Sequence, residues 1–197
     1  MINLNIKDDL KHLDRKLKGL EKSIKNKAVP QAINKTIVAV KGHASKAIAQ
    51  TTGYKQKDIR ATIVARKASK GSYDASLDAV AGKAENLIKF VRPAQQNPQV
   101  FRRRTRKGFK YSGVKAKAWG AAREYAGTFI GHSKSGNAKV YKRTGASRGK
   151  ITQVSGPSIR REFINDQLTA SMRQIARLRF RKELTAAVNN QIRKVSR

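Results

Sequence analysis

The apolar positions near the start of the chain follow a heptad spacing. Within residues 8–26 they recur every three or four residues, and mostly charged or polar side chains occupy the positions between them. The seam consists of Leu10, Leu13, Leu17, Leu20 and Ile24. This spacing predicts an amphipathic helix with one apolar face. Because the seam is too short for a self-standing coiled coil, we expect it to pack within the protein or against a neighbouring subunit.

A second apolar stripe predicts a longer helix. Val29-Pro30 predicts a break after the first helix and a new start, since proline is favoured in the first helical turn. The stripe consists of Val29, Ile33, Ile37, Val40, Ala44 and Ile48. A shorter basic amphipathic helix follows over residues 55–64. The order resembles a DNA-reading helix-turn-helix, but the short helix lacks side chains placed for base edges, which favours a structural helical layer.

Beyond Ser69 the apolar period changes from 3.6 toward 2, which is typical of short strands. The apolar runs lie at residues 73–79, 87–91, 114–118, 127–131, 138–143 and 151–154. Clusters of Gly, Ser and Asn separate them. Within 114–118, Val114 and Ala116 alternate with Lys115 and Lys117, so one face is apolar and the other cationic. We therefore predict a small antiparallel sheet or partly open barrel with a Lys/Arg-rich solvent face.

The last element returns to helical spacing, from Ser158 to about Val195, with a kink near Phe180. Its apolar stripe consists of Ile164, Leu168, Met172, Ile175, Leu178, Leu184, Val188, Ile192 and Val195. The predicted class is α+β, with N-terminal helices, a central sheet or barrel and a long C-terminal helix. The corresponding regions are 1–68, a basic β-rich core at 69–157, and a helix at 158–197 that packs on the core or on neighbouring subunits.

Charge narrows the range of partners. The 197 residues include 45 Lys+Arg against 12 Asp+Glu, a net charge of +33. Residues 86–161 hold 19 of these cations and one acid, Glu124. Self-repulsion of this size favours a polyanion or an acidic protein surface as partner. No apolar run is long enough for a membrane span, and charges interrupt the first residues where a secretory signal would be apolar.

The densest basic motif holds six cations in nine residues, within a predicted loop near 98–112. The cations are Arg102, Arg103, Arg104, Arg106, Lys107 and Lys110. Such a run binds phosphate or an acidic protein without reading sequence. The alternative is a solvated spacer that repels itself. A second basic cluster consists of Lys134, Lys139, Lys142, Arg143, Arg148 and Lys150.

The sequence offers little catalytic chemistry. His12, His43 and His132 lie far apart, without metal-ligand spacing, and the chain has no cysteine for a disulfide, a thiolate or a zinc site. Phosphate-loop, zinc-protease and serine-elbow motifs do not occur. We therefore expect no enzyme activity, no metal and no cofactor.

Several stretches at both ends of the chain resemble the phage minor tail protein Z family. They are Lys18-Gly-Leu-Glu through Val29-Pro-Gln-Ala-Ile-Asn-Lys-Thr, then Thr52-Gly-Tyr with the short basic helix, Gly145, Gly156-Pro-Ser-Ile, and the helix from Arg177 to Arg193. Together they cover about half of the chain, in the family's order. The middle matches only in character, through strands, glycines and abundant arginine.

The resemblance implies a structural protein of long-tailed phages without catalytic residues. It implies a tail-completion or neck component at the head-proximal end of the tail, assembled in the host cytoplasm, which helps the tail accept the head and the leading DNA end. The expected partners are other copies in a ring, six-fold like the tail tube, and the adjoining tail-tube, terminator and head-connector proteins. Duplex DNA in the channel is a further candidate. The alternative is a general, sequence-independent nucleic-acid-binding protein of ribosomal or DNA-packing type.

Overall fold

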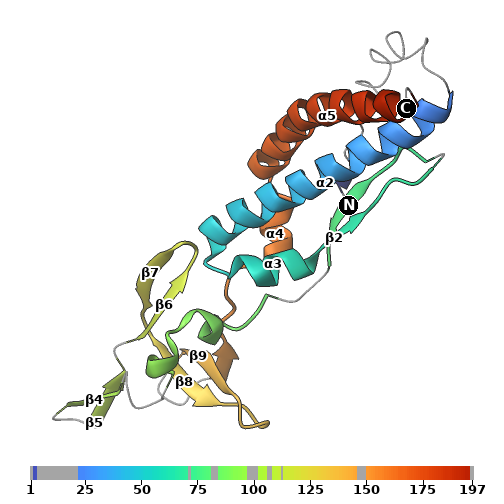
Figure 1. The fold of residues 1–197 in the computed structure, drawn as a ribbon. Helices are drawn as coiled ribbons and strands as arrows, with labels where there is room; N and C mark the ends of the chain where they lie inside the picture. Colours follow the sequence, from blue (N-terminus) through green and yellow to red (C-terminus); the bar gives the residue numbers. More distant parts are fainter. Residues whose placement is uncertain are drawn as a thin grey trace. The chain divides into compact units, whose positions relative to one another are not determined.

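The computed structural model describes residues 2–3, 22–70, 72–80, 84–96, 102–105, 108–111, 113–145 and 150–195. The chain consists of long helices and short antiparallel strands (Figure 1), which confirms the predicted α+β class. The chain divides into two compact units. The helical unit comprises Met1–Ala47, Gln56–Val80 and Glu162–Arg197, and the sheet unit comprises Ile48–Lys55 and Ala81–Arg161.

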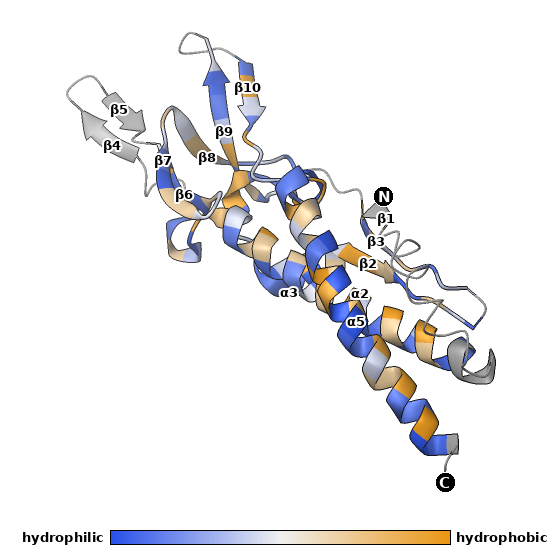
Figure 2. Cartoon of the chain, turned by 90° about the horizontal axis from the view of Figure 1, so that it is seen from above, coloured by the Kyte–Doolittle hydropathy of each residue, from blue (hydrophilic) through white to orange (hydrophobic). Residues whose placement is uncertain are grey.

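The core of the helical unit lies between two long helices, α2 (Lys22–Thr52) and α5 (Asp166–Val195). Figure 2 shows hydrophobic residues recurring along both helices, and those facing each other are buried. The cluster consists of Ala28, Val29, Ala32, Ile33, Ala68, Phe180, Leu184 and Ala187. The small residues allow close approach, while each large side chain contributes about 1.5–3 kcal/mol on burial.

Pro30 lies inside α2, so the predicted helix break at Val29-Pro30 is wrong. A proline in a helix interior removes one backbone hydrogen bond and costs about 3 kcal/mol. Its neighbours Ala28, Val29, Ala32 and Ile33 are all buried against α5 and the rest of the cluster. This tertiary packing on both sides of the proline offsets its cost, and the helix continues.

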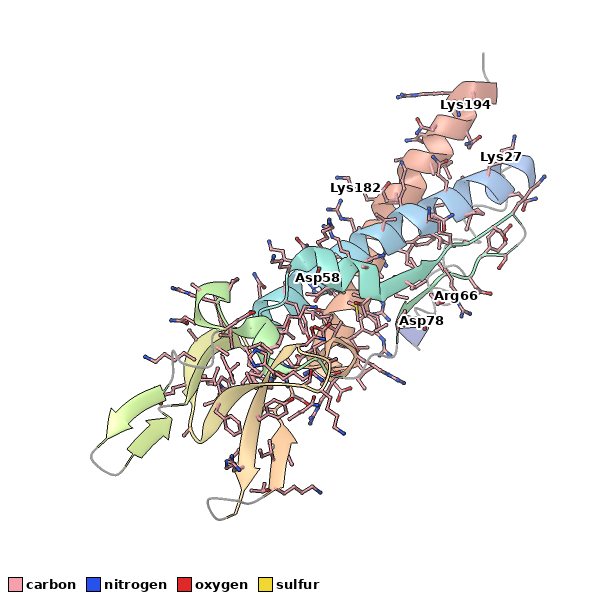
Figure 3. All side chains as sticks on the ribbon, turned by 90° about the horizontal axis from the view of Figure 1, so that it is seen from below. Lys27, Asp58, Arg66, Asp78, Lys182 and Lys194 are labelled. Carbon is pink, nitrogen blue, oxygen red and sulfur yellow. The ribbon has the colours of Figure 1, made fainter. Side chains whose placement is uncertain are left out.

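A short sheet completes the helical unit, with β1 (Ile2–Asn3), β3 (Ser76–Ala79) and β2 (Ile63–Arg66) in that order. Leu77 on β3 is buried, as the period-2 pattern predicts. The preceding helix, α3 (Gln56–Thr62), ends earlier than predicted, because Ile63 and Val64 already belong to β2. Both are β-branched, which favours extended backbone. Arg66 Nε lies 3.7 Å from Asp78 Oδ2 across the β2–β3 pair (Figure 3).

The sheet unit contains small separate antiparallel sheets. β6 (Val114–Ala118) pairs with β7 (Ala121–Tyr125), and β8 (Thr128–His132), β9 (Ala138–Thr144) and β10 (Lys150–Gln153) form a second sheet. Buried and exposed residues alternate along β6, as predicted. Val114 and Ala116 are buried, and the lysines that follow them are exposed. A further hairpin joins β4 (Arg102–Thr105) to β5 (Gly108–Tyr111).

The apolar run at 87–91 forms a 3-10 helix, η1 (Leu87–Phe90), instead of the predicted strand, and a second, η2 (Pro93–Gln95), follows. Asn86 explains the difference. Its side-chain oxygen accepts hydrogen bonds from Ile88 N, at 3.0 Å, and from Val140 N, at 2.8 Å, while its amide donates to Val140 O at 3.1 Å. The asparagine thus caps the helical turn and docks it on β9 at the same time.

The C-terminal helical region begins with a short separate helix, α4 (Ile159–Phe163), before α5. α5 continues as one helix through Phe180, where we expected a kink, and the chain leaves the helical conformation at Ile164-Asn165, between α4 and α5. The Asn165 side chain accepts a hydrogen bond from Gln167 N at 2.9 Å, as an N-cap does. Ile164, Leu178 and Ile192, which we expected in the apolar stripe, are exposed by 54%, 66% and 41%.

Candidate polyanion-binding surface

The backbone joint at the end of α2 fixes the β6–β7 hairpin in the sheet unit. Trp119 N donates to Thr52 O at 3.2 Å, so the hairpin satisfies a carbonyl of the last helical turn. Gly53 has φ +81°, and a Cβ there would lie 2.5 Å from Lys117 O. A Cβ on Gly120 would lie 2.7 Å from Gln50 O. Both glycines therefore permit a close backbone approach that other residues would prevent.

Two stretches that carry the family resemblance meet in the same unit. Tyr54 Oη donates to Pro157 O at 3.1 Å, and its ring packs edge-on against Phe90 with ring centroids 4.7 Å apart. A Cβ on Gly156 would lie 2.5 Å from a carbon of the Phe90 ring. The Thr52-Gly-Tyr and Gly156-Pro motifs are thus structural, since they hold the start and the end of the sheet unit around one phenylalanine.

Cations dominate the exposed surface that this core supports. Exposed lysines and arginines lie on β6, β7, β9 and β10 and in the turns. They include Lys115, Lys117, Arg123, Lys134, Lys142, Arg143 and Lys150. Within the described residues of the sheet unit the acids are Glu85, which pairs with Lys89 at 2.7 Å, and Glu124, which opposes Lys115 in the β6–β7 register. Most of the cations must therefore face solvent or a negatively charged partner.

One face of the three-stranded sheet combines aromatic and basic side chains. Phe129 on β8 opposes Tyr141 on β9, with ring centroids 6.1 Å apart. The guanidinium of Arg143 lies 5.5 Å from the centre of the Phe129 ring. Ile151 on β10, opposite Arg143, is 46% exposed. The arrangement suits a partner that offers both negative charge and apolar surface.

The structure brings part of the predicted second basic cluster together. Lys139, Lys142 and Arg143 lie on β9, and Lys150 lies on the neighbouring strand β10. Lys134 lies in the β8–β9 turn. Arg148 lies outside the described residues. Antiparallel pairing thus places residues distant in sequence on adjacent strands.

The densest basic motif is a hairpin and not the predicted loop. Arg102, Arg103 and Arg104 lie on β4, Lys110 lies on β5, and Arg103 opposes Lys110 in the register. Arg106 and Lys107 lie outside the described residues, between the two strands. The assignment of these six residues to phosphate or acidic-partner contact stays a prediction.

The predicted subunit-contact seam falls mostly outside the described residues. Leu10, Leu13, Leu17 and Leu20 belong to that part, and Ile24 lies in the first turn of α2. Since α2 continues from there into the buried row at Val29 and Ile33, Ile24 shares a helix with the core of the helical unit. The role of the seam stays a prediction.

α5 also carries a basic face that we did not predict. Arg173, Arg177 and Arg181 recur every four residues and are exposed, and Leu178 is exposed among them. They line a shallow surface groove together with Ala170 and Gln174. Figure 3 places two further cations, Lys182 and Lys194, on the same helix. The sequence could have indicated this face, because arginines spaced four residues apart lie on the same side of a helix.

Across the described ranges, no three His, Cys, Asp or Glu side chains lie close enough together to hold a metal ion. No helix in that part of the chain has a segment long and apolar enough to cross a membrane.

Together, the fold and this surface define an α+β protein with strongly basic exposed faces. Residues 9–197 match the family of prophage minor tail protein Z (GPZ), so the chain belongs to this family. It is a phage minor tail protein, and its place is in the tail of the virion. Neither a search of curated proteins nor a search of solved structures gives a significant match.

Proposed function

We propose that the protein completes the tail at its head-proximal end, as a neck component that helps the tail accept the head. The family supports a tail protein. The observation that carries the finer role is the excess of exposed cations over the two acids, Glu85 and Glu124, in the described part of the sheet unit. Complementary charge accelerates docking, fixes register and excludes wrong partners, as a joint between two separately assembled structures requires.

Charge arithmetic suggests which partners take up these cations. Six copies, each of +33, carry +198 in a ring matched to a six-fold tube. A duplex carries one charge per about 1.7 Å, so a channel segment of about 40 Å offers roughly 24 negative charges. Duplex DNA in the channel therefore balances a small fraction. The remainder is expected to meet acidic surfaces on the adjoining tail-tube, terminator and head-connector proteins.

The heptad seam is the proposed contact between copies in this ring. Leu13→Asp or Leu17→Asp would bury a charge in that contact and is expected to abolish incorporation into tails. His12→Asp, between seam positions, introduces the same charge and is expected to incorporate normally. The measurement is the amount of each variant in purified tails, with the melting temperature of the isolated protein as the check on folding.

Two results would contradict this assignment. Normal incorporation of both leucine variants would show that the seam is not an assembly contact. A large fall in melting temperature for both would place the seam in the protein's own core. In either case the ring contact must lie elsewhere.

The alternative, a general nucleic-acid-binding protein, is supported by the same charge and makes a different prediction. A neck component is expected in fixed stoichiometry in DNA-free tails purified before head joining, at one end of the tube. A protein retained only through nucleic acid would be absent from such tails. Antibody labelling of purified tails in the electron microscope separates the two functions.

A further inference from the structure

The tip of the β6–β7 hairpin holds a tryptophan in an unusual backbone conformation. Ala118 pairs with Ala121, so the turn has two residues, Trp119 with φ +53° and Gly120 with φ +75°. Positive φ at both positions is the requirement of a type I′ turn, which favours Asn-Gly or Gly-Gly. A bulky aromatic residue in this region is a rare outlier. The left-handed conformation costs roughly 1–2 kcal/mol for a residue with a Cβ.

The indole keeps a large exposed surface at this strained position, since Trp119 is 41% exposed. Its contribution to the joint with α2 is the backbone N–H that donates to Thr52 O, and every residue except proline would supply that group. Strain of this kind persists mainly at functional sites. The strained backbone and the exposed indole together therefore indicate that this side chain binds a partner.

Neighbouring side chains hold the indole in place. The guanidinium carbon of Arg123 lies 5.1 Å from the centre of the Trp119 ring and 5.2 Å from that of Tyr125. Arg123 Nε also donates to Tyr125 Oη at 3.0 Å, which fixes the orientation of the guanidinium. The two rings lie 6.2 Å apart. We call these three residues the Trp119 stack, an ordered cation–aromatic group with exposed ring surface.

We propose that the Trp119 stack binds single-stranded nucleic acid, with an unpaired base stacking on the exposed indole. The register places exposed Lys115 and Lys117 on the opposite face of the hairpin from Arg123 and Tyr125. The sheet unit as described has few acids, so the hairpin as a whole favours a polyanion. Phosphate contact alone needs only cations. An exposed indole adds affinity for a polyanion with flat, unpaired rings, and a duplex keeps its bases stacked inside. This site is independent of the position proposed for the protein in the tail.

The test uses the full-length protein and its own fluorescence, since Trp119 is the one tryptophan of the chain. The probes are a thymidine oligonucleotide and an abasic deoxyribose-phosphate oligomer of equal length, which has the same charge without bases. At salt high enough to weaken phosphate contacts, the thymidine oligomer is expected to quench Trp119 emission and to bind roughly 5- to 150-fold more tightly than the abasic one.

Two variants separate stacking from charge. Trp119→Asn leaves the net charge unchanged and supplies the preferred turn residue, so the melting temperature is expected to stay or rise while the preference for thymidine is lost. Trp119→Phe keeps a ring and is expected to retain part of that preference. For these variants binding is measured by the anisotropy of a labelled oligomer.

Four outcomes would overturn the proposal. Equal affinity of the wild-type protein for the thymidine and abasic oligomers would leave charge as the whole explanation. Unchanged Trp119 emission on binding would remove the indole from the contact. Equal quenching by polyglutamate would assign the stack to an acidic protein partner. Retention of the full thymidine preference by Trp119→Asn would contradict the stacking role directly.

Discussion

At the residue scale, two asparagine side chains connect distant segments through the same pair of hydrogen bonds. Asn34 on α2 donates to Ala68 O at 2.9 Å and accepts from Ala68 N at 2.8 Å, and Asn86 does the same with Val140. Each amide thus pairs with both the backbone N–H and the carbonyl of one buried residue. The sequence could not reveal these bonds, because an asparagine next to apolar positions does not indicate which distant backbone groups it pairs with.

A prediction at this scale concerns Gly156. Gly156→Ala would place a methyl group 2.5 Å from the Phe90 ring, which is itself buried, so the ring or the backbone must shift. Overpacking of this kind is expected to destabilise the protein by about 1–3 kcal/mol. The measurement is the midpoint of urea unfolding, followed by a signal from the sheet unit.

Gly42→Ala is the matched control. Gly42 lies in the interior of α2, where an added Cβ meets nothing within 4 Å. Alanine has the higher helix propensity, so this variant is expected to gain roughly 0.5–1 kcal/mol. Opposite signs for the two changes would support the assigned packing. An unchanged midpoint for Gly156→Ala would show that the Phe90 contact tolerates a methyl group.

At the element scale, periodicity identified strands and helices well where one face is buried. β6 was predictable because buried and exposed positions alternate strictly along it. α5 was predictable as a helix, but only part of its buried face was, since Met172 and Leu184 of the predicted stripe are buried and Leu178 is exposed. Its apolar residues fit more than one stripe, and contact with α2 selects Phe180, Leu184 and Ala187 and leaves Leu178 exposed. The spacing of apolar residues within α5 cannot show which face is buried, since the partner helix lies more than 100 residues away in the sequence.

Two leucines on α5 give a prediction that tests this choice. Leu184 is 2% exposed and Leu178 is 66% exposed. Leu184→Asp would bury a charge against α2 and is expected to cost more than about 4 kcal/mol or to prevent folding. Leu178→Asp is expected to change the free energy of unfolding by less than about 0.5 kcal/mol. Circular dichroism during thermal unfolding measures both. Equal destabilisation would mean that the α5 face has been assigned wrongly.

At the scale of the whole molecule, the sequence predicted the fold class and the family. It did not predict which segments distant in sequence pack together into one unit. The helical unit combines most of α2 with α5. It also contains α3, β2 and β3, which lie between those two helices in the sequence. The sheet unit likewise includes the end of α2, where Gly53 and Tyr54 hold the hairpin and Pro157. Each of these contacts depends on one or two residues that lie far apart in the sequence, so no local pattern indicates it. What the composition did establish is a large positive charge, distributed over both units.

The last prediction asks whether this charge acts as a whole or through particular segments. The isolated protein is expected to bind duplex DNA without sequence preference, and its affinity is expected to fall steeply with salt, since each neutralised phosphate releases counterions. Replacing Arg102, Arg103, Arg104 and Arg106 with alanine removes four charges from the β4–β5 hairpin region. If all four contact phosphate, the slope of log K against log salt is expected to decrease in magnitude by about 3 to 4.

The matched control removes the same charge from α5, through alanine at Arg173, Arg177, Arg181 and Lys182. These side chains lie on a helix of the other unit. If the β4–β5 hairpin supplies the phosphate contacts, the slope of this variant is expected to stay close to that of the wild type. The net charge of the two variants is identical, which removes long-range attraction as a cause of any difference. Equal flattening in both would show that DNA responds to the total charge, and the assignment of phosphate contact to the hairpin would then be wrong.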